Sequence, residues 1–143
     1  MTTIDFYFNA ADRLQLACRL AGKALAQGKR MVVYAPEPEL ASRVDRLLWT
    51  WPAVGFVPHC LVHDALAPET PVLIAAGDET PPGCEILLNL SEECPPHFAR
   101  FARLLEVVGT DDAERAAGRS RYRFYRDRGY GIANHDLAKP ADE

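Results

Sequence analysis

Five short segments of apolar character, spaced along the first 108 residues, constrain the fold of this chain most strongly. Several of them, such as MVVYA, lack the alternation of polar and apolar residues that marks a strand with one solvated face. Strands covered on both faces are typical of a parallel sheet, so we expect each segment to be a strand of one such sheet. The segments are Thr3–Phe8, Met31–Ala35, Val72–Ala76, Glu85–Leu90 and Leu104–Val108.

Segments with helical spacing lie between these strands. In Ala11–Gln27, apolar residues recur every three or four positions, and a glycine follows the last of them. A second helix is expected after the two prolines that follow MVVYA, and a short one from Pro95 to Phe101. The last helix is expected over Asp111–Arg128, because acidic residues in its first turn complement the helix dipole.

The order of these segments defines the fold class. Strands and helices mostly alternate, which predicts an α/β protein with a mainly parallel sheet and helices on both faces, in three layers of Rossmann-like type. A length of 143 residues is usual for a single domain. We expect this domain to span residues 1–133 and to be followed by a polar, flexible tail over residues 134–143.

Composition and charge exclude several classes of protein. The chain is 48% hydrophobic and 25% charged, which is ordinary for a soluble domain. No apolar run approaches the ~18 residues that span a bilayer, and no signal peptide is visible. We therefore expect a cytoplasmic protein without membrane contact. A pI near 5.6 argues against coating of duplex DNA by the whole surface.

Motifs of nucleotide-binding and hydrolytic enzymes are missing from the sequence. After the first strand the chain reads NAAD, without the glycines that let a backbone approach a pyrophosphate, and neither a Walker A nor a Gly-x-Ser-x-Gly motif occurs. Cys60 between His59 and His63 imitates a Cys–His pair or a metal site, but the spacing fits no common site. The sequence thus predicts no catalytic residue, metal or cofactor, and a small nucleotide-dependent enzyme is the weakest alternative.

The most distinctive charge pattern lies in residues 115–128, which read RAAGRSRYRFYRDR. Six of the 13 arginines of the chain fall within these 14 residues, against one acid, Asp127, in a chain whose net charge is −4. Like charges one helical turn apart repel slightly, so solubility alone explains this pattern poorly. A concentrated positive surface attracts an anionic partner.

Helical geometry predicts which of these residues share a face. At 100° per residue, one strip about 40–60° wide contains Arg115, Arg119, Tyr122 and Arg126. This strip is expected to face solvent as a line of cations around one aromatic ring. The opposite face is expected to pack on the sheet and contains Ala113, Ala117, Ser120 and Phe124.

Two kinds of partner suit such a strip. Guanidinium groups hold carboxylates or phosphates through paired donors. Together with a nearby ring and the strand end at Val107 and Val108, they fit a short acidic peptide with an apolar last residue. They also fit single-stranded nucleic acid, with bases stacked on Tyr122 or Tyr125. Charge alone does not separate these two hypotheses.

The chain resembles the chi subunit family of bacterial DNA polymerase III holoenzyme. The resemblance runs over most of the length and depends on an ordered set of short motifs. These are DFYF in the first strand, Gly28-Lys29-Arg30 before MVVYA, Leu47-Leu48-Trp49, Phe56-Val57-Pro58-His59 and Arg121-Tyr122-Arg123-x-Tyr125-Arg126-x-x-Gly129-Tyr130.

This resemblance implies a non-catalytic accessory subunit in DNA replication with little direct affinity for nucleic acid. Chi proteins bind the psi subunit of the clamp-loader complex, and they bind the acidic C-terminal tail of single-stranded DNA-binding protein, which ends in phenylalanine. The tail pocket of the family corresponds here to Val108, Arg115, Arg119 and Tyr122, with Arg126 adding electrostatic attraction. A direct single-stranded nucleic-acid-binding module is the main alternative.

The resemblance also points to a second surface. Trp49, Phe56 and Val57 are expected to contribute an apolar patch for psi, because the Phe-Val-Pro-His segment is part of the family pattern. The alternative is that these residues form a lid over the edge of the sheet.

Overall fold

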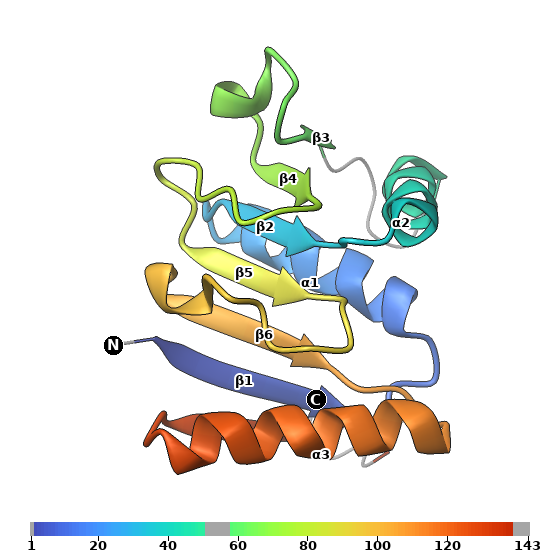
Figure 1. Ribbon diagram of the computed structural model, residues 1–143. Coiled ribbons are helices and arrows are strands. Elements are labelled where there is room, and N and C mark those ends of the chain that lie inside the picture. The colour runs from blue at the N-terminus through green and yellow to red at the C-terminus, as the bar shows by residue number, and fades with distance from the viewer. Residues whose placement is uncertain (1, 51–57, 139–143) are drawn as a thin grey trace.

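The computed structural model describes residues 2–50 and 58–138. Within these residues one sheet contains seven strands, all parallel, in the order β3-β4-β2-β5-β6-β1-β7 (Figure 1). The predicted α/β class and parallel sheet are confirmed. The strands are β1 (Thr3–Phe8), β2 (Met31–Tyr34), β3 (His59–Leu61), β4 (Val72–Ala75), β5 (Ile86–Asn89), β6 (Arg103–Val107) and β7 (Ile132–Asp136).

Helices cover both faces of this sheet. Helices α1 (Arg13–Ala26) and α2 (Pro38–Thr50) pack on one face, and α3 (Asp112–Asp127) packs on the other (Figure 1). Two short 3-10 turns, η2 (Ala67–Glu69) and η3 (Phe98–Arg100), lie in the connections, and η3 occupies only part of the short helix predicted there. No helix among the described residues is long and apolar enough to cross a bilayer.

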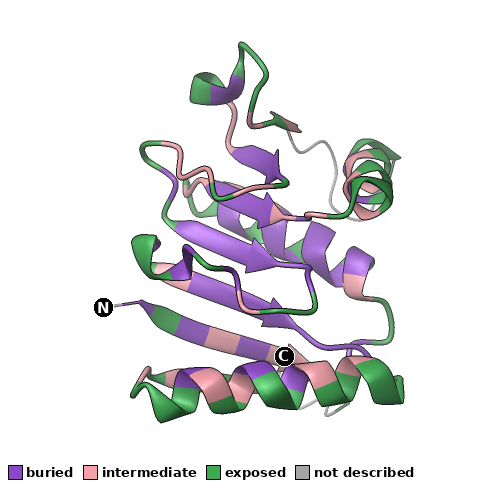
Figure 2. Ribbon diagram, in the orientation of Figure 1, coloured by how far each residue is buried: buried purple, intermediate pink, exposed green. Residues whose placement is uncertain are grey.

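The central strands are buried on both sides, as their unbroken apolar runs predict (Figure 2). Successive residues of β2 alternate between the two layers: Met31 and Val33 belong to the core beneath α1 and α2, and Val32 belongs to the core on the α3 side. Burial of both faces explains why these strands carry a strong sequence signal.

The two edge strands were not predicted. Strand β3 has only three residues, and β7 reads IANHD, without an apolar run. The predicted tail begins at residue 134, but the sheet extends to Asp136, so residues 134–136 belong to β7. Side-chain contacts with β1 and with the residue after it hold this strand: Asn9 Nδ2 donates to Asp136 Oδ1 at 2.8 Å, and the His135 ring stacks on Tyr7 at 4.4 Å. Such contacts leave no pattern of hydrophobic spacing.

Helix α3 packs through a different face from the one that small residues predict. Its buried residues are Gly118, Arg121 and Tyr125, whereas Ala113 and Ser120 are exposed. The predicted sheet-facing side is therefore wrong. The reason is that Arg121 and Tyr125 reach a buried carboxylate in β6, a polar interaction that side-chain size does not reveal.

Candidate functional site

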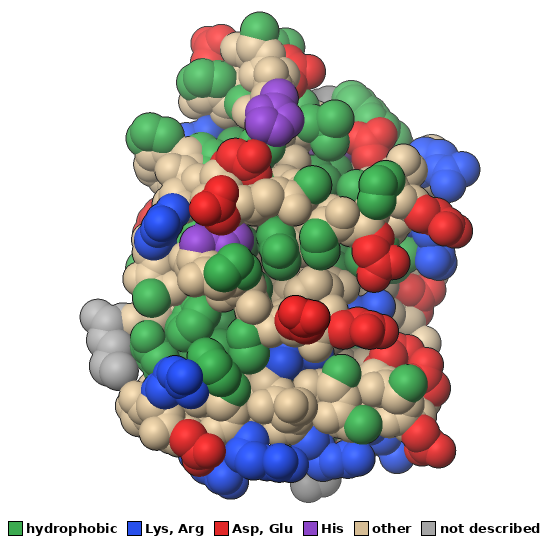
Figure 3. Space-filling model, viewed as in Figure 1, with side chains coloured by type: hydrophobic (Ala, Val, Ile, Leu, Met, Phe, Trp, Pro, Cys, Tyr) green, Lys and Arg blue, Asp and Glu red, His purple; other side chains and the backbone are tan. Residues whose placement is uncertain are grey.

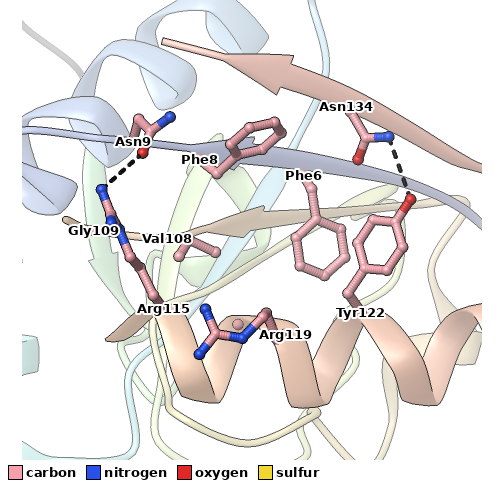
Figure 4. A pocket seen from close by; sticks show the side chains of 10 residues that line it. Phe6, Phe8, Asn9, Val108, Gly109, Arg115, Arg119, Tyr122 and Asn134 are labelled. Carbon is pink, nitrogen blue, oxygen red and sulfur yellow. Dashed lines mark hydrogen bonds between the residues drawn. The ribbon is translucent and has the colours of Figure 1, made fainter. Parts of the chain in front are cut away.

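A pocket of about 380 Å³ lies between α3 and the strands β1 and β7 (Figure 4). Four side chains predicted to form the site line it together: Val108, Arg115, Arg119 and Tyr122. The fold brings them together because β6 ends next to the start of α3, and α3 then crosses β1 on its way to β7. The other lining residues are Phe6, Phe8, Asn9, Gly109, Gly118 and Asn134.

The inner wall of the pocket is apolar. The Phe6 ring packs edge-on against the Tyr122 ring, with centroids 5.0 Å apart. Gly118 allows α3 to approach Val108 closely, since a Cβ at residue 118 would lie 2.8 Å from Val108 Cγ2. An apolar wall of this kind suits one hydrophobic side chain of a ligand.

Arginines line one side of the pocket. The guanidinium of Arg115 donates to Asn9 Oδ1 at 3.3 Å. Among the residues that the structure describes, Arg119 has no hydrogen-bond or ion-pair partner, and its side chain is exposed. All its donors are therefore available to an anion, and a carboxylate could bind two of them in parallel.

Strand β7 forms the side opposite α3. Asn134 Nδ2 donates to Tyr122 Oη at 3.3 Å, so the edge strand and the helix are linked across the pocket (Figure 4). At the other end of the pocket, Asn9 joins the two elements through its bonds to Arg115 and Asp136. Asn9 has a φ of 61°, a left-handed conformation that asparagine tolerates better than most residues.

Sequence reasoning missed the contribution of β1 and β7 to this pocket. Phe6 and Phe8 alternate within β1, so the period-two spacing of DFYF is a signal that both rings face one side. Asn134 gives no comparable signal, because its place depends on the pairing of β7 with β1.

Arg126 is the one predicted tail-binding residue that does not line the pocket. It is exposed one helical turn beyond Tyr122, and its nearest ionic partner is the adjacent Asp127, at 3.3 Å. Arg123 is also exposed on α3. These two residues can act on a ligand only where it extends beyond the pocket.

The interpretation of residues 115–128 as six surface arginines is wrong for Arg121. Its Nε lies 2.9 Å from Glu106 Oε1, and both side chains are buried. The Glu106 carboxylate also accepts a hydrogen bond of 2.6 Å from Tyr125 and two bonds from Asn89. Burial raises the pKa of Glu106, and the charge of Arg121 together with the hydrogen-bond donors opposes this shift. Glu106 interrupts an apolar run in the sequence, which is the signal of a buried partner.

Tyr125 is fully buried, at 0% exposure, and cannot stack on a base. Burial and the adjacent Glu106 carboxylate raise its pKa, so the hydroxyl remains a hydrogen-bond donor. The hypothesis of nucleic-acid stacking on Tyr125 is therefore wrong. Tyr122 is the remaining ring, and it is half-buried against Phe6.

The start of α1 occupies the place where doubly wound folds bind phosphate. Here the Asp12 carboxylate accepts hydrogen bonds of 3.1 Å from the amides of Leu14 and Gln15. Arg13 forms an ion pair of 2.7 Å with Glu114. The amides that would hold a phosphate are thus already bonded to a carboxylate of the chain itself.

The segment that contains His59, Cys60 and His63 does not form a compact cluster of side chains. His59 Nε2 lies 3.2 Å from Asp45, whereas His63 Nε2 lies 3.5 Å from Glu79. In the part of the chain that the structure describes, no three His, Cys, Asp or Glu side chains gather in a way that would hold a metal ion.

The second predicted surface lies at the far end of the sheet. Trp49, in α2, is 55% exposed, and its ring centroid lies 4.5 Å from that of His59. Phe56 and Val57 lie outside the described residues. Helix α2 contacts β3 and β4, whereas the pocket adjoins β1 and β7, so the two surfaces are at opposite ends of the sheet (Figure 1).

The fold and this pocket define the chain as a single-domain α/β protein with an apolar pocket bordered by arginines. Comparison with known proteins identifies its family. The profile of the DNA polymerase III chi subunit family, HolC, matches residues 1–133, and the chain belongs to this family. The resemblance inferred from the short motifs is confirmed, and family membership supports an accessory role in DNA replication.

Curated relatives agree with this assignment. The DNA polymerase III subunit chi of Pseudomonas aeruginosa is 38% identical over 97% of this chain and 99% of its own length. The subunit of the same name from Haemophilus influenzae is 28% identical over 86% of each chain. The Escherichia coli subunit is 29% identical over 82% of this chain and 81% of its own.

Proposed function

We propose that the pocket between α3, β1 and β7 binds the acidic C-terminal tail of single-stranded DNA-binding protein. The observation that carries this proposal is the position of Arg119, whose donors are unpaired beside an apolar wall formed by Phe6, Val108 and Tyr122. A chain end that combines an aromatic side chain with a carboxylate needs an apolar wall for the ring and a nearby cation for the carboxylate. In this proposal the ring enters the pocket and Arg119 binds the terminal carboxylate.

The proposed role is that of an adaptor. The surface around Trp49 binds the psi subunit of the clamp-loader complex, while the pocket binds the tail. Because the two surfaces lie at opposite ends of the sheet, both partners have room to bind at once. The protein acts in the cytoplasm without a cofactor or an active site of its own, and it links the clamp loader to protein-coated single-stranded DNA.

A pull-down tests this proposal directly. The purified chain should retain full-length single-stranded DNA-binding protein and lose it when the last residues of that protein are removed. Oligo-dT offered alone should bind weakly, because Tyr125 is buried and Tyr122, the other ring expected to stack on bases, is half-buried. Strong binding of oligo-dT, together with retention of the truncated partner, would establish the rival function of a direct single-strand binding module.

A further inference from the structure

Charge is distributed unevenly along α3. The start of α3 is acidic: Asp111 caps the helix, and the first turn contains Asp112 and Glu114. The second half is basic, with a single acid among its charged residues. Figure 3 shows carboxylates gathered at the end of the molecule where α3 begins and cations along the edge that α3 forms. The charged residues of the second half and its C-cap are Arg119, Arg121, Arg123, Arg126, Asp127 and Arg128, of which Arg121 is buried against Glu106.

The acidic end of α3 is built into the fold. Asp111 Oδ1 accepts a hydrogen bond of 2.7 Å from the Glu114 amide, and Glu114 pairs with Arg13 at 2.7 Å. Asp136 of β7 lies at the same end, where it binds Asn9. Arg115 lies within one helical turn of Asp111 and Asp112, and its guanidinium already donates to Asn9. This end of the pocket is a poor place for several further negative charges.

We infer that a bound acidic peptide lies antiparallel to α3, with its last residue in the pocket and its preceding residues directed past Tyr122 toward Arg126. This inference rests on the proposed function, because it assumes that the ligand is a peptide with its carboxyl end at Arg119. Figure 4 shows Arg115 at one end of the pocket, Tyr122 at the other and Arg119 between them. The opposite direction would place the acidic residues of the peptide against Asp111 and Asp112.

The spacing predicts which peptide residue meets Arg126. Arg126 lies seven positions after Arg119, which corresponds to about 10–11 Å along the helix axis. An extended peptide advances about 3.3–3.6 Å per residue, so Arg126 lies opposite a position about three residues before the last one. An acidic residue at that position should determine specificity, and its partner should be Arg126 rather than Arg115.

A double-mutant cycle tests this direction. The probe is a fluorescein-labelled synthetic peptide that ends in phenylalanine and has aspartates three and four residues before it, together with the same peptide carrying asparagines there. Binding to the full chain is measured by fluorescence anisotropy for the unaltered protein, Arg126→Gln, Arg115→Gln and Arg128→Gln. Arg128→Gln is the matched control, because it removes the same charge directly after the end of α3, at a residue whose guanidinium stacks 3.6 Å from the Phe124 ring centroid.

We expect Arg126→Gln to weaken binding of the aspartate peptide about threefold, as is usual for an exposed ion pair, and to leave binding of the asparagine peptide nearly unchanged. Arg115→Gln and Arg128→Gln should affect the two peptides equally. Coupling of the aspartates to Arg115, or equal coupling to Arg126 and Arg128, would overturn the inferred direction while leaving tail binding intact. If the unaltered chain bound neither peptide, the proposed function itself would be wrong, and the direction with it.

Discussion

Arg121 of α3 and Glu106 of β6 form an ion pair of 2.9 Å whose two side chains are buried. Tyr125 and Asn89 donate to the same carboxylate, and Arg121 also donates to the Glu92 carbonyl at 2.9 Å. This network fixes the rotation of α3 about its own axis. The same rotation directs Arg119 and Tyr122 of α3 to the pocket.

The first prediction concerns this ion pair. Arg121→Met leaves the Glu106 carboxylate buried without its cation, so the free energy of unfolding should fall by about 3–5 kcal/mol. Arg123→Met is the matched control: it removes the same charge from an exposed position of α3 and should change stability by less than about 0.5 kcal/mol. Urea unfolding measures both variants. Equal effects of the two substitutions would show that the buried pair does not hold the helix.

The second prediction concerns the contact between α3 and the pocket wall. Alanine at residue 118 has better helix propensity than glycine by about 1 kcal/mol, but its Cβ would meet both Val108 methyl groups, at 2.8 and 3.0 Å. Overpacking costs about 1–3 kcal/mol, so Gly118→Ala should be destabilising by up to about 2 kcal/mol. It should also weaken tail-peptide binding, because Val108 must move toward the pocket.

The double variant Gly118→Ala/Val108→Ala provides the control for the second prediction. Removing the Val108 methyl groups relieves the contact, so part of the stability lost in Gly118→Ala should return. Urea unfolding and peptide titration measure the two effects separately. If Gly118→Ala alone were more stable than the unaltered protein, α3 would have room for a Cβ next to Val108, and the second prediction would be wrong.

The central strands and the three helices could be predicted because burial leaves a pattern in the sequence. Strands such as β2 and β4 are covered on both faces and therefore contain only apolar or aromatic residues. The edge strands could not be predicted in this way. Strand β7 is paired on one side only and is held by polar contacts, such as that of His135 with Asp5, which depend on the final arrangement.

The position of the candidate site could be predicted even though the buried face of α3 was not. Arg115, Arg119 and Tyr122 share a strip because the helical repeat fixes their relative positions whichever face is buried. The strip flanks the buried face instead of lying opposite it. Arg121 could not be recognised as a buried residue from helical spacing, since its partner Glu106 belongs to another element.

The third prediction concerns the anchoring of β7. Burial raises the pKa of Asp5, but hydrogen bonds from Arg103, at 2.7 Å, and His135, at 3.0 Å, outweigh burial and hold this pKa below its usual value. A carboxyl group with a depressed folded-state pKa contributes stability above its unfolded pKa of about 3.9, and this contribution is lost as the pH falls through the lower folded value. Asp5→Asn removes the contribution.

Urea unfolding at about pH 6 and about pH 3 tests the third prediction. The unaltered protein should be more stable than Asp5→Asn at the higher pH, and the difference should narrow at the lower pH. Asp127→Asn, at an exposed pair on α3, is the control and should stay within about 0.5 kcal/mol of the unaltered protein. A difference for Asp5→Asn that grows on acidification would contradict the assigned direction of the shift.

The fourth prediction concerns Arg119 and the carboxyl end of the ligand. Arg119→Ala should weaken binding of a phenylalanine-ended acidic peptide by about 2 kcal/mol or more. The peptide ring shields the terminal carboxylate from water, and the substitution leaves that carboxylate without a cation. Arg119→Lys keeps the charge but loses the paired donors, so its affinity for the peptide should lie between those of Arg119→Ala and the unaltered chain. Calorimetric titration at two salt concentrations measures these affinities, and added salt should weaken all of them through screening. Amidation of the peptide end should reduce affinity for the unaltered chain far more than for Arg119→Ala, whereas equal losses would assign the carboxylate to another residue.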